Sequence, residues 1–191
     1  RLGPGPLVDV AIDPIDGAGL TAKGLPNAIS VIALADRGAM FDPGPCVYMD
    51  KVVVGPELAD VLDIAAPVED TVRAIARTRG VDVRDVTVAL LDRPRHADLA
   101  RRIRSTGARI MFLLDGDLVG ALLALTDESE IDLAVGIGGA PEGVIAACAV
   151  KCLGGAIYGK LAPRTTGEAR QARDLGLHPD AILTTDDLVK G

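Results

Sequence analysis

Two aspartates near the start of the chain are spaced so that they could bind a metal ion together. Asp13 and Asp16 lie three residues apart in the segment Asp13-Pro14-Ile15-Asp16-Gly17. Its proline and glycine predict a turn at the end of a short strand. Both carboxylates could then face one hard cation such as Mg²⁺, which prefers oxygen ligands. Because aspartate is also frequent in turns that bind no metal, the spacing alone leaves both interpretations open.

A second candidate is a loop in which two arginines flank a proline. Pro94 favours an extended backbone, so Arg93 and Arg95 could both face a phosphate, which arginine binds through its planar fork of donors. Taken alone, such a loop is more often ordinary charged surface. His96 follows it and could transfer a proton, but capping or packing is the commoner role of a histidine at the first turn of a helix.

A third candidate is the pair of carboxylates around a glycine, Asp115-Gly116-Asp117. Both could accept hydrogen bonds from sugar hydroxyls or bind a metal ion. The segment could also be a tight turn in which Asp117 caps the helix that follows. The two interpretations are compatible, so both are kept.

The glycine-rich segment at residues 136–143 satisfies no nucleotide-binding fingerprint. Pro141 stands where the last glycine of a dinucleotide-binding motif would be, and no Gly-Lys-Ser/Thr sequence follows, so a Walker A loop is excluded. What remains is a strand, a flexible loop whose amides could approach an anion, and Glu142 at a predicted helix start. The helix dipole would stabilise a carboxylate there in any case.

The elements that must position these residues alternate between strands and helices in the second half of the chain. Strand-like runs at residues 86–91, 109–114, 131–136 and 156–161 are separated by helix-length segments, which predicts parallel βαβ units. Ligands bind beyond the carboxyl ends of strands in an open α/β sheet. Because the three candidate loops follow three successive strands, we expect them to share one edge.

The first half of the chain predicts shorter strands at residues 8–12, 28–35 and 47–54. The last two are joined by a short connection that contains glycine and proline, so we expect them to be antiparallel neighbours. Pro67 predicts the start of a helix and Gly80 its end.

The composition favours an α/β fold with one core. Of 191 residues, 49% are hydrophobic and only 2% aromatic, so the core must be aliphatic, which suits buried strands covered by helices. The formal net charge of −7 repels nucleic acid and gives no attraction to an anionic membrane surface. We therefore expect neither as a partner.

The cysteines and the apolar pattern favour a soluble cytoplasmic protein. Cys148 and Cys152 lie one helical turn apart in an apolar stretch, so buried free thiols are expected rather than a disulfide framework. No apolar run reaches the ~18 residues that a membrane-spanning helix needs.

Five motifs, taken in order, resemble those of the class II fructose-1,6-bisphosphatases. The first also resembles the metal-binding turn of the wider lithium-sensitive phosphatase superfamily. The resemblance runs along essentially the whole chain and corresponds to the central portion of a family member. The motifs are Asp13-Pro-Ile-Asp-Gly17, Tyr48-Met-Asp-Lys51, Arg93-Pro-Arg-His96, Asp115-Gly-Asp117 and Gly138-Gly-Ala-Pro-Glu-Gly143.

The resemblance implies a metal-dependent phosphatase of gluconeogenesis that removes the 1-phosphate of fructose 1,6-bisphosphate to give fructose 6-phosphate. It implies Mg²⁺ or Mn²⁺ as cofactor, a sugar bisphosphate as substrate and an assembly of identical subunits. Asp13, Asp16 and Glu142 would be metal ligands, and the first two would be the catalytic residues. The implied substrate-binding residues are Asp16, Gly17, Ala18, Tyr48, Arg93, Pro94, Arg95, Asp115, Gly116, Asp117 and Gly139.

Two departures from the family pattern leave other activities open. The family has Thr at position 18, where a hydroxyl helps to position the attacking water, whereas Ala18 cannot make that hydrogen bond. Family members also have a helical segment before this start and a longer tail. These departures leave open a catalytically weakened paralogue that binds sugar phosphate. Because the size of the pocket rather than the metal-binding turn selects the sugar, a sedoheptulose-1,7-bisphosphatase and an inositol-phosphate phosphatase are also left open.

We therefore expect one incomplete phosphatase-like region over residues 1–191, with layered sheets and helices and truncated at both ends. Residues 1–66 would form a strand-rich part that carries the metal-binding turn. Residues 67–191 would form an α/β part that carries the substrate loops.

Overall fold

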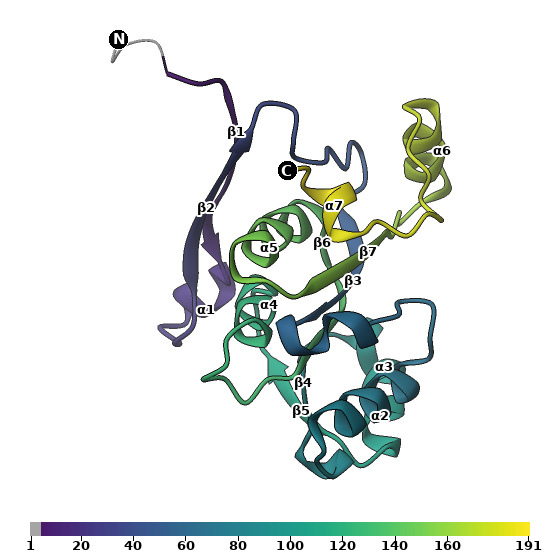
Figure 1. Ribbon diagram of the computed structural model, residues 1–191. Coiled ribbons are helices and arrows are strands. Elements are labelled where there is room, and N and C mark those ends of the chain that lie inside the picture. Colours follow the sequence, from purple (N-terminus) through teal and green to yellow (C-terminus); the bar gives the residue numbers. More distant parts are fainter. Residues whose placement is uncertain (1–4) are drawn as a thin grey trace.

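Two β-sheets of unequal size organise the chain in the computed structural model, which describes residues 5–191 (Figure 1). The smaller sheet pairs β1 (Val8–Asp16) with β2 (Ile29–Asp36) in antiparallel orientation. The larger sheet has five strands in the order β5-β4-β6-β3-β7. Together with the helices they confirm the α/β fold class. The strands of the larger sheet are β3 (Tyr48–Val54), β4 (Thr87–Leu91), β5 (Arg109–Leu113), β6 (Leu133–Gly139) and β7 (Ala156–Leu161).

Helices cover both faces of the larger sheet (Figure 1). On one face, α4 (Leu118–Ala124) and α5 (Ala140–Leu153) share an aliphatic cluster with the sheet. On the other face, α2 (Val68–Arg79) and α3 (Ala97–Ser105) share a second cluster with it. Because α5 also packs against β1 and β2, it lies between the two sheets.

The remaining helices are short and lie in the connections. They are α1 (Ala18–Ala22), α6 (Thr166–Asp174), α7 (Thr185–Leu188) and three 3₁₀ turns, η1 (Pro56–Val61), η2 (Val83–Asp85) and η3 (Pro94–His96). The predicted helix boundaries at Pro67 and Gly80 are confirmed, since they cap the two ends of α2. Gly80 has a φ of 68°, a left-handed conformation that glycine adopts without strain.

The three strands expected to share an edge are parallel. β4 pairs with β5 on one side and with β6 on the other, both in parallel orientation. All five residues of β4 are buried, as expected for a central strand with helices on both faces. The segments that follow β4, β5 and β6 therefore lie at one edge of the sheet.

The predicted pairing of residues 28–35 with residues 47–54 is wrong. β2 pairs with β1 in the smaller sheet, whereas β3 lies between β6 and β7 and is antiparallel to both. The physical reason is burial. The last four residues of β3 are all buried, which requires an interior position, whereas β2 alternates between exposed and covered side chains.

Two predicted loops are also absent from the described residues, because strands run through them. β1 continues past Asp13 to Asp16 with a register shift between the two, and the chain turns only at Gly17. A proline is tolerated at such an irregularity because no ladder hydrogen bond is required of it. Likewise, residues 136–139 belong to β6, and α5 begins directly at Ala140.

All three cysteines are free thiols, as expected, but only Cys46 and Cys148 are buried, whereas Cys152 is exposed. Within residues 5–191, no helix combines the length and the apolar composition required to cross a membrane.

A buried aspartate joins one end of the larger sheet to α2. Asp132 is only 3% exposed; its Oδ2 accepts a hydrogen bond from the Thr87 amide at 2.7 Å, and its carboxylate forms an ion pair with Arg79 at the end of α2. Removing a buried carboxylate leaves its partners without a hydrogen-bond acceptor in the protein interior. The contact is therefore expected to be important for stability.

We predict that Asp132→Ala lowers the free energy of unfolding by about 3 kcal/mol in urea denaturation. The matched control is Asp98→Ala, which removes an exposed ion pair with Arg101 and should cost less than about 0.5 kcal/mol. Equal losses in the two variants would contradict the structural role of Asp132.

Candidate functional site

An open cleft of about 1000 Å³, counting the solvent at its mouth, lies where the predicted site residues meet. It collects side chains from β1, from the start of β3 and from the segments that follow β4, β5 and β6. Of the predicted residues, only Pro94 does not line it. The predicted residues that do are Asp13, Asp16, Gly17, Ala18, Tyr48, Arg93, Arg95, Asp115, Gly116, Asp117, Gly139 and Glu142. The remaining lining residues, which were not predicted as site residues, are Ile15, Val47, Leu91, Gly138 and Pro141.

Asp16 is a deeply buried carboxylate in this cleft. It is 6% exposed, and its Oδ2 has no hydrogen-bond partner among the described residues. Burial, together with the negative charges of Asp117, Asp13 and Glu142, raises the pKa of Asp16 to about 6. Burial likewise raises the pKa of Glu142. A buried, unpartnered carboxylate oxygen beside other carboxylates is a position that a bound cation would stabilise.

Glycines make the close packing of these carboxylates possible. A Cβ atom added at any of four glycines would overlap a carboxylate oxygen, and even in the least crowded pair the separation would be only 2.7 Å. Any side chain at these positions would therefore push a carboxylate out of place. The pairs are Gly116 with Asp16, Gly19 with Asp115, Gly138 with Asp117, and Gly139 with Glu142.

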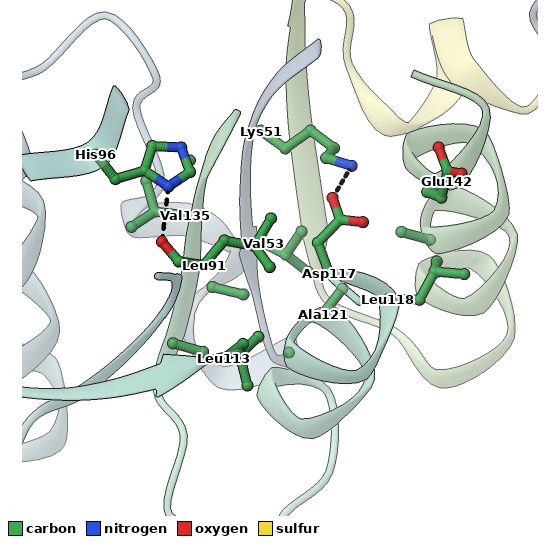
Figure 2. A pocket seen from close by; sticks show the side chains of 15 residues that line it. Lys51, Val53, Leu91, His96, Leu113, Asp117, Leu118, Ala121, Val135 and Glu142 are labelled. Atoms are coloured by element: carbon green, nitrogen blue, oxygen red, sulfur yellow. Dashed lines mark hydrogen bonds and ion pairs between the residues drawn. The ribbon is translucent and has the colours of Figure 1, made fainter. Parts of the chain in front are cut away.

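Lys51 supplies a buried positive charge next to the acidic residues. It is 7% exposed, its Nζ donates a hydrogen bond to the Gly139 carbonyl at 2.8 Å, and it forms an ion pair with Asp117. Figure 2 shows Lys51 and Asp117 pointing toward each other from β3 and from the start of α4, in a pocket that Glu142 also lines. The pair satisfies two groups that would otherwise be buried without partners.

The role of Lys51 was missed in the sequence, although one signal was available. It is a lysine directly before the apolar run Val52, Val53 and Val54, and a lysine in an interior strand is rarely buried unless it is paired. The expected helix cap by the Asp117 side chain is wrong, because that side chain pairs with Lys51. Asp117 occupies the N-cap position of α4, but its side chain makes no capping hydrogen bond because it is turned toward Lys51.

Asp115 connects two of the segments that form the cleft. One carboxylate oxygen accepts a hydrogen bond from the Gly19 amide at 2.8 Å, which holds α1 against the end of β5. The other oxygen accepts one from Arg93 Nη2 at 2.6 Å. Both oxygens are thus already engaged, so Arg93 is neutralised in place and Asp115 mainly fixes the cleft wall.

Arg95 is arranged differently from Arg93. Its Nε and Nη2 donate hydrogen bonds to the Ile137 carbonyl at 3.1 and 2.7 Å, and its guanidinium carbon lies 5.2 Å from the centre of the Tyr48 ring. Within the described residues it forms no ion pair with a carboxylate. Its charge is therefore available to an anion in the cleft.

His96 has a packing role, which confirms the commoner interpretation of the sequence. It is 3% exposed, and its Nε2 accepts a hydrogen bond from the Ile137 amide at 2.9 Å. Its Nδ1 lies 2.9 Å from the Leu91 carbonyl (Figure 2) and therefore carries the proton. Burial lowers the pKa of His96, which keeps the ring neutral.

The donors of the cleft fit a hard cation in type but do not form a complete ligand set. Within residues 5–191, no three His, Cys, Asp or Glu side chains are grouped closely enough to hold a metal ion. Asp13 Oδ1 accepts a hydrogen bond from the Ile15 amide at 3.1 Å. The free Oδ2 of Asp16 is the observation that favours a cation. The assignment of Asp13, Asp16 and Glu142 as metal ligands stays a prediction.

Comparison with known proteins points to one family. The family model described as "Bacterial fructose-1,6-bisphosphatase, glpX-encoded" matches residues 1–191. The "Fructose-1,6-bisphosphatase class 2" of Haemophilus influenzae is 38% identical over 201 residues, covering 98% of this chain and 60% of the relative. The "Fructose-1,6-bisphosphatase 1 class 2" of Escherichia coli strain K12 is 36% identical over 176 residues, covering 91% and 52%. The chain thus spans little more than half the length of these relatives.

The raised pKa of Asp16 predicts how stability depends on pH. The folded pKa of about 6 lies above the unfolded value of 3.8, so the folded chain holds the proton more tightly. The stability contributed by the protonated group is fully present below pH 3.8 and is lost as pH rises through 6. We predict that Asp16→Asn, which removes this loss, raises the free energy of unfolding by about 2 kcal/mol at pH 7.5 and hardly at all at pH 4.

Urea denaturation in a chelating buffer measures this difference at both pH values. Asp70→Asn, at an exposed position of α2, is the control and should show no comparable gain at pH 7.5. A pH-independent effect of Asp16→Asn would contradict the burial of an ionisable carboxylate at this position.

Proposed function

Because the chain belongs to the bacterial class II fructose-1,6-bisphosphatase family, we propose that it forms the substrate cleft of a metal-dependent phosphatase. The reaction would be hydrolysis of the 1-phosphate of fructose 1,6-bisphosphate to give fructose 6-phosphate, a step of gluconeogenesis. One observation carries the proposal. Residues from all five motifs, which are far apart in the sequence, line a single cleft.

The acidic part of the cleft is proposed to bind the phosphate that is removed. Asp13, Asp16 and Glu142 would hold Mg²⁺ or Mn²⁺ through oxygen donors, which both ions prefer. Such a cation would activate a water molecule and neutralise charge on the phosphoryl oxygens. Without a cation the carboxylates would repel the substrate, which explains why the chemistry of this part requires one.

The arginine-containing part is proposed to bind the phosphate that is kept. Arg95 carries a guanidinium group that forms no ion pair within the described residues, and it lies beside Tyr48 at the cleft. Arginine binds phosphate through two parallel hydrogen bonds, so it can fix the orientation of the sugar as well as attract its charge. Lys51 supports this arrangement indirectly, because it neutralises Asp117 and thereby reduces the repulsion of an anionic ligand.

A catalytically weakened paralogue remains the second candidate, and Ala18 is the observation that favours it. Ala18 is exposed at the cleft, where it begins α1 directly after Gly17. Its methyl group can neither donate nor accept a hydrogen bond to an attacking water. Such a chain would bind sugar bisphosphate and turn it over slowly.

A cytoplasmic location and a homo-oligomeric assembly complete the proposal. Three free thiols suit a reducing compartment. The assembly follows from the family resemblance and is tested by sedimentation of the purified chain.

The reaction is tested by phosphate release from fructose 1,6-bisphosphate with Mg²⁺ or Mn²⁺. We predict that Asp16→Asn lowers kcat by roughly 100-fold or more, because the variant loses a charged ligand of the cation. Asp70→Asn should retain full activity, and sedoheptulose 1,7-bisphosphate and inositol 1-phosphate are the rival substrates. Faster hydrolysis of a rival, or activity that survives Asp16→Asn and chelation, would contradict the proposal.

Restoring the family residue tests the second candidate. We predict that Ala18→Thr raises kcat by roughly 10-fold, with little change in KM, because a hydroxyl orients the attacking water without adding a contact to the substrate. Ala18→Val, which has the shape of threonine but no hydroxyl, should give no gain. If both variants behave like the parent chain, Ala18 does not limit turnover.

A further inference from the structure

The ring of Tyr48 is flanked by two arginines that come from distant parts of the chain. Arg95 follows β4, and its guanidinium carbon lies 5.2 Å from the ring centre. Arg164 lies between β7 and α6, and its guanidinium carbon lies 5.5 Å from the same centre. Both distances are within the range of a cation–π contact. Only one of the two arginines was singled out in the sequence.

Both guanidinium groups keep donors that no described residue uses. Arg95 donates hydrogen bonds from its Nε and Nη2 to the Ile137 carbonyl, and its Nη1 donates none to residues 5–191. The guanidinium of Arg164 makes no hydrogen bond or ion pair with any of residues 5–191, and its side chain is exposed. Arg93, in contrast, already pairs with Asp115. Two guanidinium groups that form no ion pair with any of residues 5–191 therefore lie beside one aromatic ring.

The position of Arg164 is fixed by its backbone. Glu168 in the first turn of α6 accepts hydrogen bonds from the Val47 amide at 3.0 Å and from the Arg164 amide at 2.8 Å. One carboxylate thus ties the connection between β7 and α6 to the residue immediately before Tyr48. These amides, with a smaller contribution from the positive charge of Arg164, keep the pKa of Glu168 low.

Two positive charges beside one ring attract an anion that both guanidinium groups can reach. A phosphate dianion suits the place well, because each guanidinium can offer paired N–H donors and the Tyr48 hydroxyl can offer one more. Arg95, Arg164 and the Tyr48 hydroxyl therefore provide the hydrogen-bond donors that an anion-binding site needs.

We propose that Arg164 and Arg95 form a phosphate subsite around Tyr48, and that Arg164 makes the cleft specific for bisphosphates. This inference rests on the proposed function, since it names the residue that recognises the phosphate that is kept. It also assigns different roles to Arg93 and Arg95, which line the cleft, and to Arg164, which contacts the ring of Tyr48. Arg93 stabilises the cleft wall through its ion pair with Asp115, whereas Arg95 and Arg164 contact the ligand.

The first test compares two substrates in the Arg164→Gln variant. For fructose 1,6-bisphosphate we expect kcat/KM to fall by roughly 10- to 100-fold, mostly through KM, because a charge-assisted contact to the retained phosphate is lost. Fructose 1-phosphate lacks that phosphate, so its kcat/KM should change by less than about twofold. Arg170→Gln, an exposed arginine of α6 without an ion pair among residues 5–191, is the matched control. Arg164→Lys should fall between the parent and the Gln variant.

The second test measures binding without turnover. Fructose 6-phosphate carries only the retained phosphate, and its dissociation constant from calorimetry should rise by roughly 10-fold in Arg164→Gln and not in Arg170→Gln. Equal behaviour of these two variants in both assays overturns the subsite. Absence of turnover in the parent chain with every sugar phosphate overturns the proposed function alone, because the calorimetric comparison still decides the role of Arg164.

Discussion

The cleft depends on how a cluster of buried negative charges is compensated. Four carboxylates lie close enough to influence one another, and within residues 5–191 only Asp117 forms an ion pair with a buried cation, Lys51. Because the Lys51 ammonium group also binds the Gly139 carbonyl, it joins β3, β6 and the start of α4 at the base of the cleft. Asp16 has no ion-pair partner among residues 5–191, and burial together with the neighbouring carboxylates raises its pKa. The ion pair between Lys51 and Asp117 thus stabilises the carboxylate cluster, whereas Asp16 is left at a position where a bound cation would be stabilising.

The layer order explains how this cluster forms from distant segments. α5 lies between the two sheets, so the residue at its start, Glu142, can face the end of β1. β6 runs into α5 without a loop, which keeps Gly138 and Gly139 rigid beside the carboxylates. A flexible loop there would lose conformational entropy each time a ligand bound, which would weaken binding. Replacing the expected loop by a strand end is therefore consistent with a preorganised site.

The sequence predicts much of this arrangement, for a clear physical reason. The segments after β4, β5 and β6 could be placed at one edge because parallel strands end together. The pairing of β2 could not, since an alternating apolar pattern does not say which strand will be its neighbour. The apolar run at Val52, Val53 and Val54 already indicated an interior strand. Lys51 and Arg164 were missed because their partners lie far away in the sequence and only the fold brings them together.

The two differently charged parts of the cleft suggest how one phosphate is chosen for hydrolysis. Within the proposed subsite, a phosphate beside Arg95 and Arg164 would meet positive charge that the chain itself supplies, so it would need no cation to bind. A phosphate beside Asp13, Asp16 and Glu142 meets negative charge and can bind only when a cation is shared between the protein and the phosphate. Within the proposed function, only the second phosphate is therefore placed where water can be activated. Charge asymmetry, rather than the shape of the sugar alone, would then decide which ester bond is broken.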